Sequence, residues 1–291
     1  MSERSGVFRT GAALSLAGFL LANPAPQALS SRELAAQGSD ALQGPLDEIL
    51  DVNVRDGLVY YRALQSTRGR LDRYAASLDV PAGTYEAWPA EARMAFWVNA
   101  YNTFVLQTVI NRYPIRGRSQ EYPPSSIRQI PGAFDSIRHR AAGRSVTLDE
   151  IEKTILPEFK EPRLFLALGR GAIGSGRLRS EAYTAARLAK QLDAVKAEFV
   201  AETNMLRVDR IAGQISVTPI LSWNEAAFIA AYDGGASGPY AQRSPIERAL
   251  MAFITPHLLP LEREFVEGNT FRVTYHDFDW RLNDLTGGGP R

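Results

Sequence analysis

A serine in a glycine-rich loop is the first candidate for chemistry in this chain. Residues 163–180 read Arg-Leu-Phe-Leu-Ala-Leu-Gly-Arg-Gly-Ala-Ile-Gly-Ser-Gly-Arg-Leu-Arg-Ser, an apolar run that leads into four glycines within eight residues. Glycine lacks a Cβ, so the backbone can turn sharply and approach a ligand closely. The hydroxyl of Ser175 becomes a nucleophile if a neighbouring base takes its proton. Arg177 and Arg179 follow and are candidates to bind an anionic group.

The same loop contains the spacing Gly169-x-Gly171-x-x-Gly174, which matches a dinucleotide-binding fingerprint. In a true fingerprint the next helix begins within the glycines, so that its amides meet the pyrophosphate. Here the next helix cap is Ser180, and Asp193, at about the spacing of the ribose-binding acid, falls in mid-helix. We therefore predict that the match is accidental and that no cofactor binds. A closely packed structural turn and a site around Ser175 remain as alternatives.

The block Ala95-Phe-Trp-Val-Asn-Ala-Tyr-Asn102 combines aromatic and amide side chains in one predicted helix. Asn99 and Asn102 are three residues apart and therefore share a side of that helix. Burying an amide without partners is unfavourable, so this pair predicts specific hydrogen bonds. These bonds either fix a loop or contact a ligand. Trp97 and Asn99 are candidate ligand-binding residues, and Asn102 is a candidate oxyanion donor beside Ser175.

Histidine and cysteine offer little further chemistry. The chain has no cysteine, which excludes disulfides, thiolate metal sites and cysteine nucleophiles. The three histidines, His139, His257 and His276, include no pair with metal-binding spacing on one helix, so we predict no metal site. We expect His139 to be solvated in an arginine-rich loop and His276 to have a structural role.

The elements that position these residues are predicted from apolar periodicity and caps. Pro89 begins the strongest helix, which stops before Pro114. The capping box Thr147-Leu-Asp-Glu150 begins a short helix that Pro157 ends. The remaining predictions are a turn at 56–57 between alternating residues of 46–61, helices over 64–78, 180–202, 220–232 and 245–257, a buried strand over 163–168, short strands within 207–219 and 271–280, and loops over 114–134 and 233–239. Many helices with few strands indicate an α+β fold, a helix-rich single domain with a small antiparallel sheet.

The N-terminus predicts export. Arg4 and Arg9 precede an apolar run over residues 11–22. This run has the length of a signal-peptide core and is too short to span a bilayer. We predict a signal peptide over residues 1–30, with cleavage between 22 and 31, then a linker over 31–45 and one domain over 46–291. The expected location is periplasmic or secreted. The alternative is an inner-membrane protein anchored only through an uncleaved N-terminal segment.

Composition narrows the class of partner. The chain has 291 residues, 45% of them hydrophobic, and a formal net charge of +1, so it resembles an ordinary soluble protein with no sign of nucleic-acid binding. Residues 116–144 are rich in arginine but are predicted to be a solvated loop without stacking aromatic residues. The expected partner is an envelope protein, a peptide or a small molecule.

Several blocks, taken in order, resemble one family, the bacterial domain of unknown function 547. They are Asp56-Gly-Leu-Val-Tyr-Tyr61, the 95–102 block, Thr147-Leu-Asp-Glu-Ile-Glu152, Pro162-Arg-Leu-Phe-Leu-Ala167, the Gly171 loop, Ser180-Glu-Ala-Tyr183, Leu221-Ser-Trp223 and Asp279-Trp-Arg-Leu-Asn283. The resemblance covers residues 46–283. It implies an α+β fold related to papain-like cysteine peptidases and transglutaminases, with a cysteine–histidine site.

The chain departs from the family pattern at that site. The resemblance places Ser175 where the family has its cysteine and Lys153 where it has its histidine. A lysine base needs a pKa lowered towards neutrality. We favour a catalytically degenerate protein that acts as a binding or interaction module in the cell envelope. The alternatives are a hydrolase or acyl/peptidyl transferase that uses a Ser175–Lys153 pair with Asn102, and a purely structural protein whose loops contact a partner.

Overall fold

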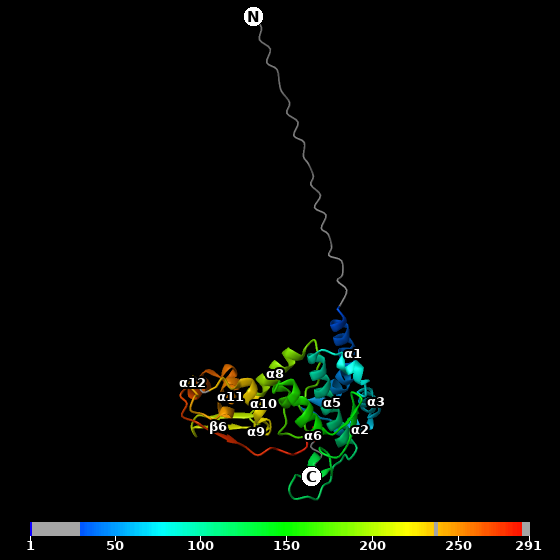
Figure 1. The fold of residues 1–291 in the computed structure, drawn as a ribbon. Coiled ribbons are helices and arrows are strands. Elements are labelled where there is room, and N and C mark those ends of the chain that lie inside the picture. Colours follow the sequence, from blue (N-terminus) through cyan, green and yellow to red (C-terminus); the bar gives the residue numbers. More distant parts are fainter. Residues whose placement is uncertain (2–29, 236–237, 287–291) are drawn as a thin grey trace.

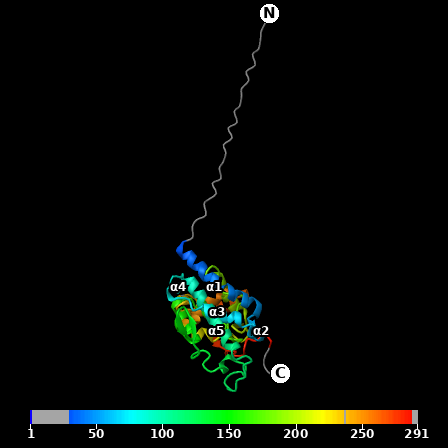
Figure 2. The same ribbon diagram turned by 90° about the vertical axis from the view of Figure 1, so that its right-hand side faces the viewer.

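Helices surround one buried helix in the first part of the chain. The computed structural model describes Met1 and residues 30–235 and 238–286 (Figure 1). The helices here are α1 (Ser31–Asn53), α2 (Tyr61–Ser66), α3 (Gly69–Ser77), α4 (Ala82–Glu86) and α5 (Ala90–Ile110). Nearly every residue of α5 is buried, and α1, α2 and α3 pack against it (Figure 2). A helix that is apolar on all sides belongs in a core, so the predicted helix from Pro89 is confirmed.

Helix α1 corrects the predicted linker over residues 31–45. Its N-terminus is a capping box, in which the backbone N–H of Ser30 donates to the Glu33 carboxylate at 2.8 Å and the Ser30 hydroxyl accepts from Glu33. Gly38, Gly44 and Pro45 lie inside this helix. These residues are poor helix formers, which is why the pattern resembled a linker. The predicted signal peptide falls almost entirely on residues 2–29, outside the described part of the chain.

A short hairpin follows α1. Strand β1 (Val54–Arg55) pairs antiparallel with β2 (Leu58–Val59) around the predicted turn, where Asp56 and Gly57 have φ values of 50° and 81°. The predicted turn is confirmed. The alternation predicted from residue 46 onward is wrong up to Asn53, because those residues continue α1 and bury its apolar side against α5.

The middle of the chain contains the predicted capping box at Thr147. Strands β3 (His139–Ala141) and β4 (Arg144–Val146) form a hairpin before α6 (Leu148–Glu150), which continues through the wider turn η2 (Ile151–Ile155) and the tight turn η3 (Leu156–Phe159). The predicted capping box of Thr147 and Glu150 is confirmed, whereas Pro157 does not end the helical segment but lies inside η3. The predicted strand over 163–168 is wrong, because this run forms α7 (Arg163–Leu166). A short buried apolar run suits a helical turn as well as a strand.

Helix α8 (Leu188–Ala201) starts later than the predicted residue 180. The backbone before it is occupied by side chains of earlier helices. Tyr183 donates its N–H to Asn99 of α5 at 3.0 Å, and Ala185 donates to Asp40 of α1 at 2.6 Å. These bonds to distant side chains hold residues 180–187 outside a helix.

The C-terminal part holds a three-stranded sheet with helices beside it (Figure 1). Its elements are β5 (Leu206–Asp209), β6 (Gln214–Val217), α9 (Ile220–Trp223), α10 (Glu225–Tyr232), α11 (Pro245–Ile254), η4 (Thr255–His257), α12 (Pro260–Glu267) and β7 (Arg272–Tyr275). Strands β5 and β6 are antiparallel, as predicted, whereas β7 pairs parallel to β6. The α+β prediction is confirmed, and the largest sheet is mixed.

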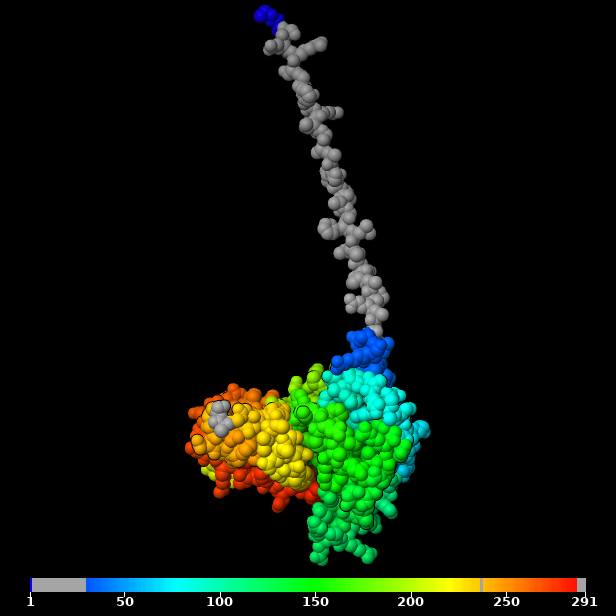
Figure 3. Space-filling model, in the orientation of Figure 1, coloured from blue at the N-terminus to red at the C-terminus, as the bar shows by residue number. Residues whose placement is uncertain are grey.

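The last described residues return across the molecule to its N-terminal part. Bridges join Ala172 to Leu282 and Val59 to Asp284. In Figure 1 this segment runs along the lower side of the sheet towards α2 and α6, and Figure 3 shows the two parts of the surface that it joins. One hydrophobic cluster contains residues from Leu46 to Leu282. The glycine loop lies where these two parts meet.

Candidate functional site

The glycine loop is fixed at both ends by side chains and backbone from elsewhere. At its start, Asn102 of α5 accepts from Gly169 N at 2.8 Å and donates to Ala167 O at 3.2 Å. Further on, Gly174 N donates to Asp279 O at 2.9 Å. The loop therefore lies between α5 and the returning C-terminal segment.

Close packing explains the glycines of this loop. A Cβ at Gly176 would lie 1.6 Å from the carbonyl oxygen of Leu166, and one at Gly174 would lie 2.7 Å from Asp279 N. The helix that a dinucleotide fingerprint requires does not begin here, because among residues 163–201, all of them described, the helix after the loop starts only at Leu188. The observed turn matches the structural alternative, in which glycine is needed for backbone approach.

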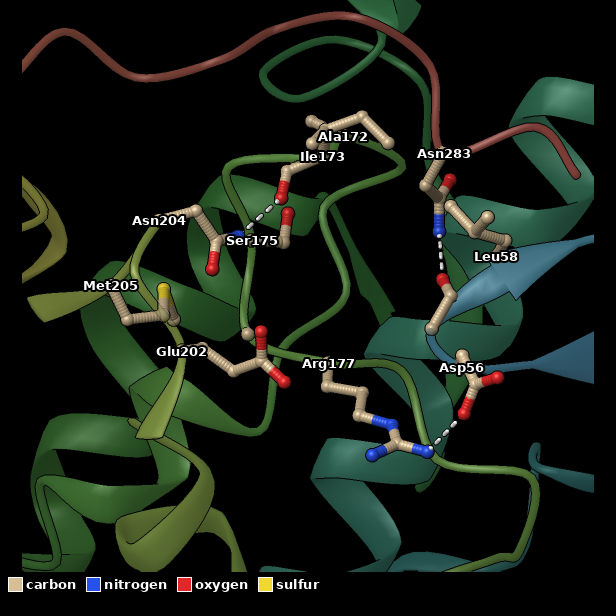
Figure 4. A pocket seen from close by; sticks show the side chains of 12 residues that line it. Asp56, Leu58, Ala172, Ile173, Ser175, Arg177, Glu202, Asn204, Met205 and Asn283 are labelled. Carbon is tan, nitrogen blue, oxygen red and sulfur yellow. Dashed lines mark hydrogen bonds and ion pairs between the residues drawn. The ribbon is translucent and has the colours of Figure 1, made fainter. Parts of the chain in front are cut away.

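Ser175 lies at the wall of a pocket of about 330 Å³ (Figure 4). Only 5% of the residue is exposed. Its Oγ accepts a hydrogen bond from Arg170 N at 3.0 Å, and its own N–H donates to Ala172 O. The pocket is lined by Asp56, Gly57, Leu58, Ala172, Ile173, Ser175, Gly176, Arg177, Glu202, Asn204, Met205 and Asn283.

Lys153 does not accompany Ser175. Its Nζ lies 2.7 Å from the carboxylate of Asp149, one turn earlier on the same helical segment, and its side chain is 68% exposed. It lines a different pocket, and within the described part of the chain it makes no hydrogen bond to Ser175. The partner of the lysine ammonium is therefore a carboxylate, and the structure does not bring the two residues of the predicted pair together.

A buried ion pair occupies the space beside the loop. Arg170 is only 2% exposed and donates from Nε to Glu152 Oε1 at 3.2 Å and from Nη1 to Phe165 O at 3.2 Å. The Tyr101 hydroxyl donates to the other carboxylate oxygen of Glu152 at 3.0 Å. Burial, followed by the charge of Glu152, raises the pKa of Tyr101 well above its ordinary value.

This ion pair is not among the predicted site residues, although the sequence contains a signal for it. Arg170 interrupts an apolar and glycine-rich run, and a charge in such a run requires a partner. The partner, Glu152, is next to Lys153, the residue to which the family resemblance directed attention. A pairing across 18 positions cannot be assigned from spacing alone.

The two other candidates on α5, Asn99 and Trp97, make hydrogen bonds inside the protein. Asn99 Oδ1 accepts from Tyr183 N at 3.0 Å, and its Nδ2 donates to Tyr183 O at 2.8 Å and to Gln43. Trp97 is fully buried, and its indole N–H donates to the hydroxyl of Tyr85 at 2.8 Å. The polar atoms of both residues are thus engaged inside the protein, and the bonds of Asn99 to Tyr183 agree with the alternative that this asparagine fixes a loop.

The two candidate anion-binding arginines, Arg177 and Arg179, do not line the same pocket. Arg177 lines the Ser175 pocket and pairs with Asp56 at 2.7 Å (Figure 4). Arg179 pairs with Glu181 and Glu198, each at 3.0 Å, and does not line that pocket. Only Ser175 and Arg177 of the predicted site therefore share a pocket.

A second pocket, of about 470 Å³, was not anticipated. The guanidinium carbon of Arg128 lies 4.4 Å from the ring centroids of both Phe134 and Trp280. This corrects the prediction that the arginine-rich segment lacks stacking aromatic residues. We call this site the arginine–aromatic pocket, and it is lined by Tyr122, Arg128, Phe134, Asp149, Glu152, Lys153, Arg170, Trp223, Asn224 and Trp280.

His139 also differs from its prediction. Instead of being solvated, its ring stacks on Phe104 with centroids 4.3 Å apart, and its Nε2 is buried without a hydrogen-bond partner in the described structure. Burial lowers the pKa of His139 to about 4. His276 has the expected structural contacts, with Nε2 2.9 Å from Asn204 O and Nδ1 3.4 Å from Ser216 Oγ.

Two broader properties apply to the described residues alone. Over 30–235 and 238–286, no group of three or more histidine, aspartate and glutamate side chains is arranged to hold a metal ion. Among the helices of those ranges, none has the length and apolar character needed to cross a membrane.

The fold and the loop define a class, a helix-rich α+β protein whose glycine loop is anchored on a buried central helix. Residues 85–200 match the family model described as protein of unknown function, DUF547. This match supports the family that the motif blocks predicted, and the matched region contains α5, the Thr147 cap and the glycine loop. No curated protein and no solved structure matches the chain. The relation to papain-like peptidases stays a prediction.

Proposed function

We propose that this protein is a binding module of the cell envelope that does not catalyse acyl transfer. The observation that carries the proposal is the environment of Ser175. Its Oγ accepts the backbone N–H of Arg170, and Lys153 is engaged with Asp149 at the wall of another pocket. A serine nucleophile needs a base within about 2.6–3.2 Å of its hydroxyl. The observed N–H is a donor to Ser175 and cannot take its proton.

The contacts of Asn102 also support a protein that does not catalyse acyl transfer. Both ends of its amide are occupied, since it accepts from Gly169 N and donates to Ala167 O. An oxyanion donor has to aim at the position where negative charge develops, whereas this amide holds the loop backbone. The alternative function, a hydrolase or acyl/peptidyl transferase with Ser175 and Lys153, would require both Lys153 and Asn102 to exchange their present partners.

The proposed location rests on the basic and apolar residues before position 23. Helix α1 begins at Ser31, at the end of the predicted cleavage window, so cleavage before its cap residue Ser30 would leave the whole helix in the mature protein. N-terminal sequencing of the protein from a periplasmic fraction should give a start between residues 23 and 32. An intact N-terminus in the membrane fraction would instead support the anchored alternative.

Labelling with a fluorophosphonate tests the absence of a reactive serine. Wild type and Ser175→Ala should show the same background labelling, because no base activates the hydroxyl. Labelling of the wild type that is lost in both Ser175→Ala and Lys153→Met would overturn the proposal and establish the Ser–Lys alternative. Circular dichroism of each variant verifies that a lost signal does not reflect unfolding.

A further inference from the structure

We propose that the arginine–aromatic pocket binds a small monocarboxylate that carries an aromatic ring, with the carboxylate on Arg128 and the ring against Trp223 and Trp280. This inference rests on the proposed binding function and names its ligand class. A volume of about 470 Å³ lies within the range of small-molecule sites, about 300–1,000 Å³. Such sites combine aromatic walls with a few convergent polar groups.

The net charge of the pocket indicates that its ligand carries a single negative charge. Its lining contains three cations, Arg128, Lys153 and Arg170, and two carboxylates, Asp149 and Glu152, so the formal net charge is +1. The two carboxylates are already paired, with Lys153 at 2.7 Å and with Arg170. One positive charge is left, which suits a monoanion better than a phosphate with two charges.

Arg128 carries that remaining charge. Within residues 30–235 and 238–286 its guanidinium has no carboxylate partner and no side-chain hydrogen bond, and its recorded contacts are the rings of Tyr122, Phe134 and Trp280. Stacking on aromatic rings fixes the plane of a guanidinium without using its N–H donors. A guanidinium held in this way is prepared for a bidentate carboxylate.

The apolar part of the ligand is inferred from the tryptophans. Trp223 is 47% exposed although it is one of the largest apolar side chains. Its ring is stacked with that of Trp280, at a centroid distance of 6.3 Å and an interplanar angle of 19°. Exposed apolar surface gathered in this way marks binding sites, and an offset-stacked or edge-on aromatic ring would continue the arrangement.

The pocket draws its walls from distant parts of the chain. Tyr122, Arg128 and Phe134 come from the long segment after α5, Trp223 from the end of α9, and Trp280 from the returning C-terminal segment. The guanidinium carbon of buried Arg170 also lies 5.9 Å from the centroid of the Trp223 ring. Arg170 and Glu152, the ion pair next to the glycine loop, both line this pocket, whereas Ser175 lines the other one.

Isothermal titration calorimetry with benzoate, 3-phenylpropionate and indole-3-acetate tests the proposal, with 3-phenylpropionamide as a neutral match for the second probe. At least one carboxylate should bind, and 3-phenylpropionate should bind about tenfold more tightly than its amide, because an ion pair to Arg128 of about 1.4 kcal/mol corresponds to that ratio. Arg128→Gln should remove this difference. Trp223→Ala should weaken carboxylate and amide alike.

Arg177→Gln is the matched control, because it removes an arginine from the Ser175 pocket instead and should leave binding unchanged. The proposal is overturned if none of the three carboxylates binds, if the amide binds as tightly as the carboxylate, or if Arg177→Gln has the effect expected of Arg128→Gln. Tight binding of the neutral amide would indicate an uncharged ligand class. Fluorophosphonate labelling at Ser175 would refute the non-catalytic role alone, so the two proposals fail separately.

Discussion

Arg170 and Glu152 form an ion pair inside the core, and the backbone of the same arginine holds the hydroxyl of Ser175. The guanidinium of Arg170 donates to the carboxylate of Glu152, while Arg170 N donates to Ser175 Oγ at 3.0 Å. Ser175, which the family resemblance aligns with a cysteine, is therefore linked through Arg170 to a buried salt bridge. Stability and site geometry should respond to the same substitutions.

Glu152→Gln should lower the free energy of unfolding by about 3–5 kcal/mol, because it leaves the buried Arg170 cation without its counter-charge. Asp149→Asn is the matched control. It breaks the ion pair with Lys153, whose side chain is 68% exposed, and should cost less than about 1 kcal/mol. Urea unfolding measures both variants. A cost for Glu152→Gln as small as that of the control would show that the buried pair contributes little.

Gly176→Ala should prevent the loop from adopting its present path. The added Cβ would lie 1.6 Å from Leu166 O, a contact that only a backbone shift can relieve, and we expect a loss of more than about 4 kcal/mol. Gly38→Ala tests the opposite case, because a Cβ there meets nothing within 4 Å inside α1. It should stabilise by about 0.5–1 kcal/mol. Thermal unfolding that ranks the two variants in the reverse order would contradict this account.

Asn102→Ala should destabilise the protein by about 2–4 kcal/mol, since it leaves Gly169 N and Ala167 O without their partner. Thr108→Val on the same helix is its control. The Thr108 hydroxyl is buried and has no hydrogen-bond partner in the described structure, so an apolar isostere should be neutral or mildly stabilising. Denaturant unfolding of both variants measures the difference, and equal losses would argue against a loop-fixing role for Asn102.

His139 should make stability depend on pH between about 4 and 6.5. Burial lowers the pKa of the folded-state imidazole from 6.5 to about 4, so in this window the unfolded chain binds a proton that the folded chain does not. Stability is therefore complete above the unfolded pKa and falls as the pH drops towards the folded one, by about 1–3 kcal/mol.

His139→Phe isolates this effect from the titration of carboxylates. The phenyl ring keeps the stacking on Phe104 and removes the titrating group. The unfolding free energy of the variant, measured at pH 7.5 and pH 5, should change less than that of the wild type. Identical changes in the two proteins would assign the pH dependence to other groups.

Local signals in the sequence predicted local structure well. The apolar pattern after Pro89, the Thr147–Glu150 capping box and the Asp56–Gly57 turn are all found in the structure. Each of these features is determined by residues within a few positions of one another. Helix α1 was missed because Gly38 and Pro45 weaken the pattern, while burial of Leu46 and its neighbours against α5 stabilises the helix.

The candidate site depended on contacts that no local pattern encodes. Arg128 stacks on Trp280, and Arg170 finds Glu152, only after the chain has folded. Ser175 and Arg177 line one pocket because they are neighbours in sequence. The pairing of Ser175 with Lys153 came from a family resemblance, which aligns positions along the chain and does not determine which side chains meet when those positions are substituted.

The contacts between the C-terminal segment and the first hairpin can form only late in synthesis. The hydroxyl of Tyr61 donates to Asn283 at 2.7 Å, and Asn283 donates to Gly57 O at 2.9 Å. These partners lie more than two hundred positions apart, so the first hairpin stays incomplete until almost the whole chain has been made. Contacts this distant in sequence form late.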